Sequence, residues 1–102
     1  MRQPVYSGQF QRDIKRSRKR GKDMDKLKTV AQYLISGESL PPRYKDHSLG
    51  GDWAHHRECH IEPDWLLIYR LLGEGSEIRF ERTGHPRRPV PLIYTSTSNN
   101  RS

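Results

Sequence analysis

The apolar positions in the first third of the chain follow a helical period. Ser7 is a favoured N-cap residue, and the residues after it predict a helix that reaches about Lys19 and is stopped at Gly21. Asp23 can cap a second helix, which reaches about Ser36 and is closed by Gly37. The inward side of the first helix is formed by Phe10, Ile14 and Ser17, and that of the second by Met24, Leu27, Val30, Ala31, Leu34 and Ile35. The short link between them predicts an antiparallel helix pair.

The second half of the chain shows the patterns of strands. In residues 53–61 alternation places Cys59 and Ile61 on one face and Glu58 and His60 on the other. The run from Leu66 to Leu72 is the most apolar and predicts the central strand. The predicted strands cover residues 5–6, 53–61, 66–72, 77–83 and 90–94. Two helices followed by an antiparallel sheet predict an α+β domain in which the helix pair packs on the sheet.

The predicted domain covers residues 1–94, and the Ser/Thr/Asn-rich residues 95–102 are expected to be a disordered tail. Between helices and strands, residues 40–51 contain two prolines and two glycines, which predict a loop. This loop carries Lys45, Asp46 and His47. Functional side chains concentrate on loops over a rigid scaffold, although a single surface histidine is usually incidental.

One turn gathers reactive side chains. Pro63 fixes its own backbone and pushes the residue before it toward extended geometry, so residues 62–64 are expected to turn between two strands. His60 enters this turn, and Asp64 and Trp65 leave it. The turn therefore places an imidazole, a carboxylate and a large aromatic ring at one end of a strand pair, although it could also serve only to connect the strands.

Composition limits the class of protein. The chain has 102 residues, of which 31% are hydrophobic and 30% charged, enough for a single modest core. No run approaches the roughly 20 apolar residues that a membrane span needs, and the N-terminus lacks the apolar segment of a signal peptide. The single cysteine, Cys59, excludes an internal disulfide framework. We expect a cytoplasmic protein with no membrane partner.

The net charge of +7 lies entirely in the first third of the chain. Residues 1–30 hold ten Lys and Arg against three Asp, whereas residues 31–102 hold nine of each sign. Four of these cations follow helical spacing on the outer side of the first predicted helix: Arg12, Lys15, Arg16 and Lys19. Such a stripe suits the phosphate backbone of a nucleic acid or an acidic protein, although a solvated helix face can also be basic.

The histidines raise two chemical hypotheses. The spacing of His47, His55, His56 and His60 with Cys59 is not that of a zinc site, so no metal is expected. Metal-free cleavage of RNA fits better, because the 2′-OH is a built-in nucleophile and needs only a base, an acid and cations near the phosphate. The residues for this chemistry would be His47, His60, Asp64, Arg82 and His85. Trp65 could stack on a base.

Three segments carry a resemblance to a known family. They are residues 40–49 (Leu-Pro-Pro-Arg-Tyr-Lys-Asp-His-Ser-Leu), 60–69 (His-Ile-Glu-Pro-Asp-Trp-Leu-Leu-Ile-Tyr) and 79–84 (Arg-Phe-Glu-Arg-Thr-Gly). With residues 6–10 and 21–24, they resemble the YafQ branch of the RelE superfamily of type II toxins over residues 5–84. The resemblance implies a small RelE-like fold, cleavage of mRNA in the ribosomal A site, and no cofactor.

The resemblance also implies partners and site residues. The partners would be the ribosome with its mRNA and a cognate antitoxin, usually of the ribbon-helix-helix type, whose complex with the toxin binds operator DNA. His47, His60 and Asp64 match the catalytic positions of the family, and Trp65 matches a position that supports the substrate or the site. We add Lys45 and Arg82 as substrate-binding candidates and assign the four-cation stripe to ribosomal RNA.

The end of the chain departs from the family pattern. His85 follows Gly84 directly, one residue out of register, and the terminal Leu-Phe of the family is absent. One hypothesis is that the native ending has been replaced, which would leave a weakened or inactive toxin that still binds the ribosome or its antitoxin. Natural divergence is the rival explanation, in which His85 remains catalytic. A basic DNA- or RNA-binding regulator ranks last, because no motif for reading nucleic acid is present.

Overall fold

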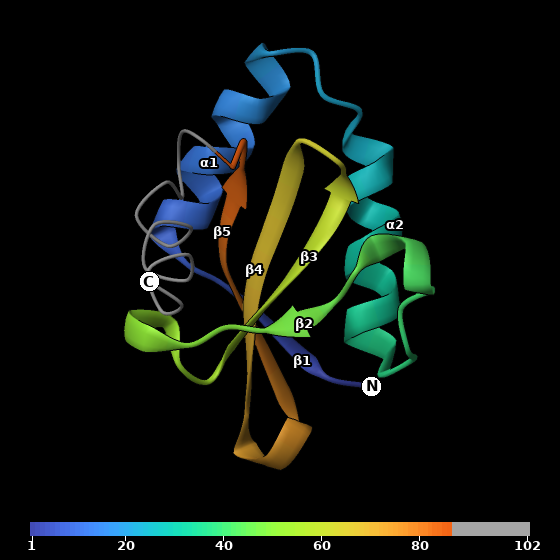
Figure 1. Ribbon diagram of the computed structural model, residues 1–102, viewed down its shortest axis with the longest axis vertical. Coiled ribbons are helices and arrows are strands. Elements are labelled where there is room, and N and C mark those ends of the chain that lie inside the picture. The colour runs from blue at the N-terminus through green and yellow to red at the C-terminus, as the bar shows by residue number, and fades with distance from the viewer. Residues whose placement is uncertain (87–102) are drawn as a thin grey trace, which may run out of the picture.

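Five strands form one sheet in the order β1-β5-β4-β3-β2 (Figure 1). A computed structural model of the chain describes residues 1–86. The strands are β1 (Gln3–Tyr6), β2 (His47–Ser48), β3 (His56–Glu62), β4 (Trp65–Leu72) and β5 (Glu77–Gly84). β4 is the middle strand, as its apolar sequence predicted. β1 runs parallel to β5, and the other pairs are antiparallel. The parallel pair is possible because the whole domain lies between these two strands, which gives the long crossover that parallel pairing needs.

The two helices begin and end where the sequence predicted. In α1 (Gly8–Lys19), Ser7 is the N-cap, and its Oγ accepts a hydrogen bond from the Phe10 N–H at 2.9 Å. In α2 (Met24–Ser36), the Asp23 carboxylate caps the Asp25 N–H at 2.9 Å. Gly37 ends α2 in the left-handed region, with φ 84°, where a residue without Cβ is favoured.

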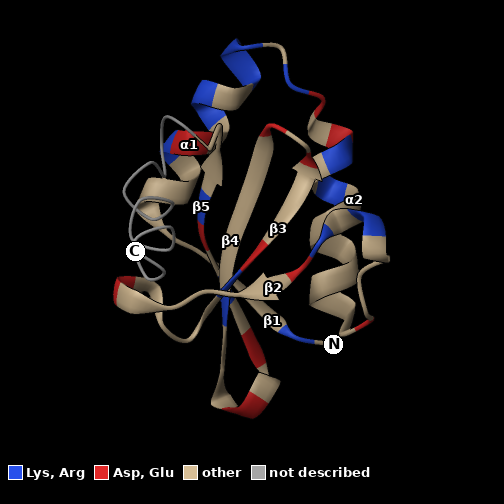
Figure 2. Cartoon of the chain, viewed as in Figure 1, with Lys and Arg blue, Asp and Glu red and all other residues tan. Residues whose placement is uncertain are grey.

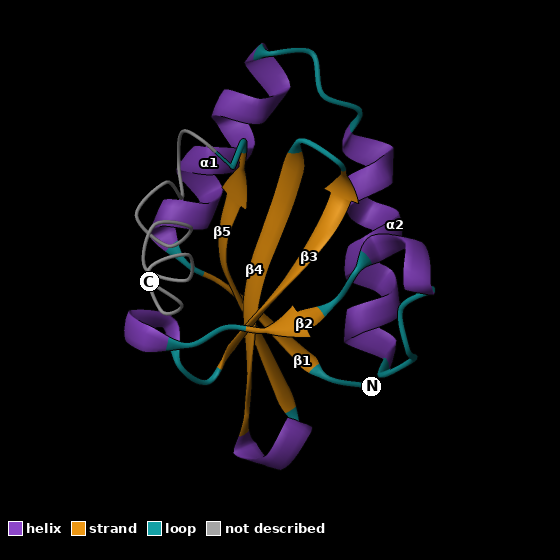
Figure 3. Cartoon of the chain, viewed as in Figure 1, coloured by secondary structure: helices purple, strands orange, loops and turns teal. Residues whose placement is uncertain are grey.

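Both helices cover the same face of the sheet, α1 along β5 and α2 along β3 (Figure 3). The core on this face joins residues of α1 and α2 to alternate residues of β3, β4 and β5. Its members from the sheet are Cys59, Ile61, Trp65, Leu67, Tyr69, Ile78 and Phe80. On the opposite face, Leu66 and Ile68 are buried under Leu49 and Trp53. Because side chains alternate along the apolar strands, the sheet contributes to a core on each of its faces. The predicted α+β fold with a helix pair on a sheet is confirmed.

Two predictions about the segment before β3 were wrong in detail. Residues 53–55 do not belong to the strand: Trp53 ends a short 3₁₀ turn, and His55 has a positive φ of 73°, which breaks the extended path before His56. Residues 40–51 are not irregular throughout, because they contain a 3₁₀ turn, η1 (Pro42–Tyr44), and the short strand β2. Residues 62–64 do form the expected turn between β3 and β4. The expected strand at 90–94 and the expected disorder at 95–102 lie outside the described residues.

Within residues 1–86, no helix is long and apolar enough to cross a membrane.

Candidate active site

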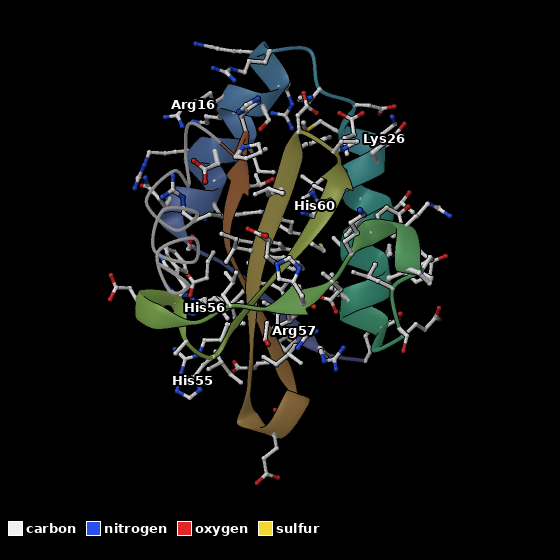
Figure 4. The ribbon with its side chains drawn as sticks, viewed as in Figure 1. Arg16, Lys26, His55, His56, Arg57 and His60 are labelled. Atoms are coloured by element: carbon white, nitrogen blue, oxygen red, sulfur yellow. The ribbon has the colours of Figure 1, made fainter. Side chains whose placement is uncertain are left out.

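The fold brings the loop histidine and the strand histidine together. β2 pairs with β3 in a register that sets His47 opposite Glu58, two residues before His60. The centres of the His47 and His60 rings are 6.4 Å apart. His55 and His56 lie toward the other end of β3 (Figure 4), and His56 contacts Glu81 instead. Of the neighbouring histidines, the structure therefore groups His47 with His60.

Glu58 is a member of this group that sequence analysis did not single out. The His47 Nε2 lies 3.1 Å from the Glu58 Oε1, and the Glu58 side chain is only 3% exposed. The His47 Nδ1 lies 2.7 Å from the Lys45 carbonyl oxygen, which can only accept, so Nδ1 carries the hydrogen. The sequence signal was present, because alternation placed Glu58 on the face of His60. That signal is weak, because a glutamate in a strand is usually solvated.

A partly exposed ion pair holds the loop that carries His47. Asp46 accepts hydrogen bonds from Arg57 Nε and Nη2, both at 3.3 Å, and from Tyr69 Oη at 2.6 Å. Burial and the bond to Asp46 raise the pKa of the Tyr69 hydroxyl well above its usual range, so Tyr69 remains a donor. Asp46 and His47 point to opposite faces of the sheet edge, because neighbours in an extended segment alternate. One residue anchors the loop, and the next is presented on the other face.

Asp64 lies in the turn between β3 and β4, and its partner is a lysine. The Lys22 Nζ lies 3.3 Å from Asp64 Oδ1 and 3.0 Å from Glu62 Oε1, and Lys26 Nζ lies 2.8 Å from Glu62 Oε2. These bonds, that from Lys26 first, lower the pKa of the Glu62 carboxyl. Within residues 1–86, Asp64 is hydrogen-bonded to neither His47 nor His60. The expected carboxylate next to an imidazole is instead Glu58.

Trp65 cannot take the stacking role in this conformation. Its side chain is 1% exposed and belongs to the core beneath the helices. The Lys22 Nζ lies 5.7 Å from the centre of the ring. Trp65 therefore supports the turn from below, and no face of its ring is open to a base. An alternating pattern cannot distinguish a ring that supports a site from one that contacts a ligand.

Arg82 is held by a buried aspartate that was not predicted. Arg82 Nε donates to Asp13 Oδ2 at 2.8 Å, and the Thr83 N–H donates to the same oxygen at 3.1 Å. Asp13 is 1% exposed, whereas the Arg82 side chain is 18% exposed. The guanidinium is thus largely engaged in joining α1 to β5. His85 follows β5 and lines a small hollow with Trp65 and Lys22, near the turn that carries Asp64.

A hollow of about 650 Å³ opens beside His60. It lies between α2, the 3₁₀ turn η1 and the end of β3; Figure 4 shows Lys26 on α2 and His60 on β3, and both line it. The residues that line it are Lys26, Arg43, Tyr44, Lys45, His60, Ile61, Glu62 and Pro63. Its charge is mainly positive, and Lys45, a substrate-binding candidate, stands at its rim. The hollow is therefore suited to an anionic ligand.

The four-cation stripe lies on the outer side of α1, where Arg12, Lys15, Arg16 and Lys19 are all exposed. Figure 2 shows positive residues concentrated along α1 and over the start of α2. Arg16 also lies 3.5 Å from Asp13. The stripe is on the β5 side of the molecule, away from the hollow beside His60.

The remaining nucleophile and metal candidates give no site. Burial raises the pKa of the Cys59 thiol far above its usual range, so a reactive thiolate is disfavoured. Within the described part of the chain, no cluster of three or more His, Cys, Asp or Glu side chains could hold a metal ion.

Comparison with known proteins gives a consistent result. The profile of a family described as "Bacterial toxin of type II toxin-antitoxin system, YafQ" matches residues 2–87. The chain is 51% identical over 80 residues to the mRNA interferase toxin YafQ of Escherichia coli, which covers 78% of this chain and 85% of that protein. Among solved structures, the crystal structure of the E. coli DinJ–YafQ complex matches with a TM-score of 0.80 and 46% identity, covering 88% of this chain and 99% of that one. A metal-bound toxin from Helicobacter pylori matches with a TM-score of 0.77 and 35% identity, covering 83% and 94%.

Proposed function

Because this chain belongs to the YafQ family of bacterial toxins of type II toxin–antitoxin systems, we propose that it is an mRNA interferase, an endoribonuclease that cuts messenger RNA. The observation that carries the proposal is the pairing of His47 with His60 beside a cationic hollow. Two imidazoles next to a binding site for an anion are the groups that RNA cleavage by proton transfer requires.

The reaction is a transesterification at phosphorus. A base removes the proton of the 2′-OH, the new bond from O2′ to phosphorus forms, and the bond from phosphorus to the 5′-oxygen breaks. An acid protonates the leaving 5′-oxygen, so atoms and charge balance without water or metal in this step. His60 and His47 are the proposed proton-transfer groups. In this conformation the Lys45 carbonyl oxygen and Glu58 engage both ring nitrogens of His47, so His47 exchanges a proton with the RNA only once its Nε2 has left Glu58. The nearby cations stabilise the charge that develops on the phosphate.

The other candidates have narrower roles in this proposal. Asp64 lies in the turn between β3 and β4, which its ion pair with Lys22 holds in place beside the site. Arg82 supports the end of β5 through its ion pair with Asp13 and adds positive charge there. His85 follows β5 directly, where it could assist proton transfer despite its displaced register. Trp65 keeps the turn in place from the core side.

The partners follow from the family. The target is mRNA in the A site of the ribosome in the cytoplasm, and the α1 stripe binds ribosomal RNA. A cognate antitoxin of the ribbon-helix-helix type neutralises the toxin, and their complex binds operator DNA. A relative's crystal structure in complex with DinJ supports an antitoxin as partner. The exposed cations of α1 support an anionic surface as the second partner.

The test is cleavage of mRNA on programmed ribosomes, mapped by primer extension. We expect cuts in phase with codons from the wild type and a loss of at least about a hundredfold for His60→Ala, since a proton-transfer group contributes 10²–10⁴-fold. His55→Ala, which changes a histidine that precedes β3 and lies away from His60, is the matched control and should cleave normally.

A third variant, in which a serine is inserted between Gly84 and His85 and the chain ends in Leu-Phe as in the family, separates two outcomes. Cuts only from this variant would make the chain a disabled toxin that retains its binding surfaces. An absence of cuts from every variant, with ribosome binding intact, would contradict an enzymatic function and leave a binding module.

A further inference from the structure

The cations near the candidate site divide into two classes. Lys22 and Lys26 are engaged by Glu62, and Arg57 is engaged by Asp46. Arg43 and Lys45, which line the hollow beside His60, have no carboxylate within ion-pair distance among residues 1–86. Two cations without an acidic partner at the rim of one hollow make it a place of uncompensated positive charge, to which an anion is attracted.

The Arg43 guanidinium is held by its neighbour. Its centre lies 4.7 Å from the centre of the Tyr44 ring, and Nη2 donates a hydrogen bond to Tyr44 Oη at 3.0 Å. Tyr44 is itself buried in the core. An arginine has five N–H donors, so most of them remain open for a ligand. A group that is positioned by stacking loses less freedom on binding than an unrestrained side chain.

Lys45 links this cationic rim to the histidines. It ends the 3₁₀ turn with φ 52°, a left-handed conformation that is uncommon for a residue with a Cβ. Its carbonyl oxygen accepts from His47 Nδ1 at 2.7 Å. The same short segment therefore orients His47 and turns the Lys45 and Arg43 side chains toward the hollow. An unfavourable backbone conformation at such a place is typical of functional sites.

We infer that the hollow beside His60 is a subsite for the RNA phosphate adjoining the scissile bond, with Arg43 and Lys45 as its binding cations. This inference rests on the proposed function, because it takes the reacting phosphate to lie between His47 and His60. The next phosphate along the strand then falls beside the histidines, where the hollow opens. Its volume of about 650 Å³ leaves room for the sugar and base attached to that phosphate.

An acidic segment of an antitoxin is the alternative ligand, because carboxylates and phosphates are both bound by arginine. RNA is favoured here by position, since the cations share a segment with His47 and flank His60. A site that only bound a neutralising protein would not need to share its backbone segment with His47.

The experiment uses a probe that cannot be cut. An RNA trinucleotide with 2′-O-methyl riboses lacks the nucleophile, and its binding to the full chain is followed by NMR of the backbone amides. Arg43→Gln and Lys45→Gln should each raise the dissociation constant about tenfold, the usual effect of losing one hydrogen bond to a charged group. The control is Lys28→Gln, an exposed lysine of α2 that lines no part of the hollow and carries the same charge change. It should stay within about twofold of wild type.

A second variant guards against misfolding. Arg43→Lys keeps the charge but not the stacking on Tyr44, and it should retain most of the affinity if the charge binds phosphate. On programmed ribosomes, Arg43→Gln should raise KM more than it lowers kcat, because the contact is made in both ground and transition states.

The outcomes are distinguishable. Trinucleotide binding at residues 43–45 and 60–63, weakened by Arg43→Gln, with no cleavage of mRNA would support the subsite and contradict the proposed catalysis. Normal cleavage with Arg43→Gln equal to Lys28→Gln would overturn the subsite and leave the catalysis in place. If Arg43→Gln bound the trinucleotide like wild type but bound the antitoxin more weakly, the subsite would also be overturned, and the hollow would be assigned to antitoxin binding.

Discussion

Lys22 lies in the link between α1 and α2 and contacts the turn between β3 and β4 that carries Asp64. It lies 3.0 Å from Glu62, 3.3 Å from Asp64, and over the ring of Trp65. Burial opposes its charge, but hydrogen bonds to Glu62 and Asp64 outweigh this and raise the pKa of the ammonium above 10.5. Lys22 is therefore charged throughout the neutral range, and it restrains a carboxylate whose side chain is 58% exposed.

We predict that Lys22→Met lowers the rate of mRNA cleavage about tenfold, because Asp64 loses the cation that orients it. Lys26→Met is the matched control. Lys26 also binds Glu62 but does not reach Asp64, so cleavage should stay within about threefold. Loss of the partly exposed ion pairs of Lys22 should cost only about 1 kcal/mol or less of unfolding free energy.

If Lys22 acted only by stabilising the fold, Lys22→Met and Lys26→Met would lower the rate of cleavage equally. Lys22→Arg keeps the cation, so this variant should cleave mRNA at about the wild-type rate, unlike Lys22→Met. Equal rates for Lys22→Met and Lys26→Met at equal stability would contradict the positioning role.

At the scale of elements, the contact between α1 and β5 depends on one buried acid. Asp13 accepts from Arg82 Nε at 2.8 Å and from the Thr83 N–H at 3.1 Å, in the buried interface between the two elements. A buried carboxylate is tolerated when an arginine and backbone donors compensate it. The end of β5, from which the chain continues to His85, is thereby tied to the first helix.

We predict that Asp13→Ala lowers the free energy of unfolding by about 3 kcal/mol, because the Arg82 cation is then left without its partner in a mainly buried place. Urea denaturation measures this, and Asp25→Ala, which changes an exposed aspartate in the first turn of α2, should cost less than about 1 kcal/mol. A change below 1 kcal/mol for Asp13→Ala would show that Arg82 finds another partner and is free to contact phosphate.

At the scale of the molecule, the basic surface and the candidate active site lie on different sides of the domain. The exposed cations of α1 lie along β5, and the candidate histidines lie at the β2–β3 edge with their own hollow. This separation suits a protein that docks on a large polyanion with one surface and cuts a strand with another. Docking through several phosphate contacts is strongly salt-dependent, whereas a reaction at one phosphate is not.

We predict that replacing Arg12, Lys15, Arg16 and Lys19 together with Gln reduces the slope of log Kd for ribosomes against log salt by about 3, from the loss of up to four phosphate contacts. Binding of the short 2′-O-methyl probe should change less than about twofold, because the stripe does not line the hollow. An unchanged slope would show that another surface meets ribosomal RNA.

The sequence by itself determined the elements and much of the order of the sheet. Caps and stops at Ser7, Asp23 and Gly37 marked the helices, and the apolar run at 66–72 marked the central strand, because these signals act within a few residues. The motifs around His47 and His60 also indicated the family, because they are long and specific. The start of β3 was missed because a positive φ at His55 overrode a pattern that continued to alternate.

Only the tertiary structure decided which side chains meet. The pairing of β2 with β3 places Glu58 against His47, the packing of α1 on β5 buries Asp13 against Arg82, and the link between the helices brings Lys22 to Asp64. It also buried Trp65, which the sequence offered as a stacking surface. Each of these contacts joins residues that are separated by 11 to 69 positions or covered by another element, and local sequence carries no information about partners at that distance.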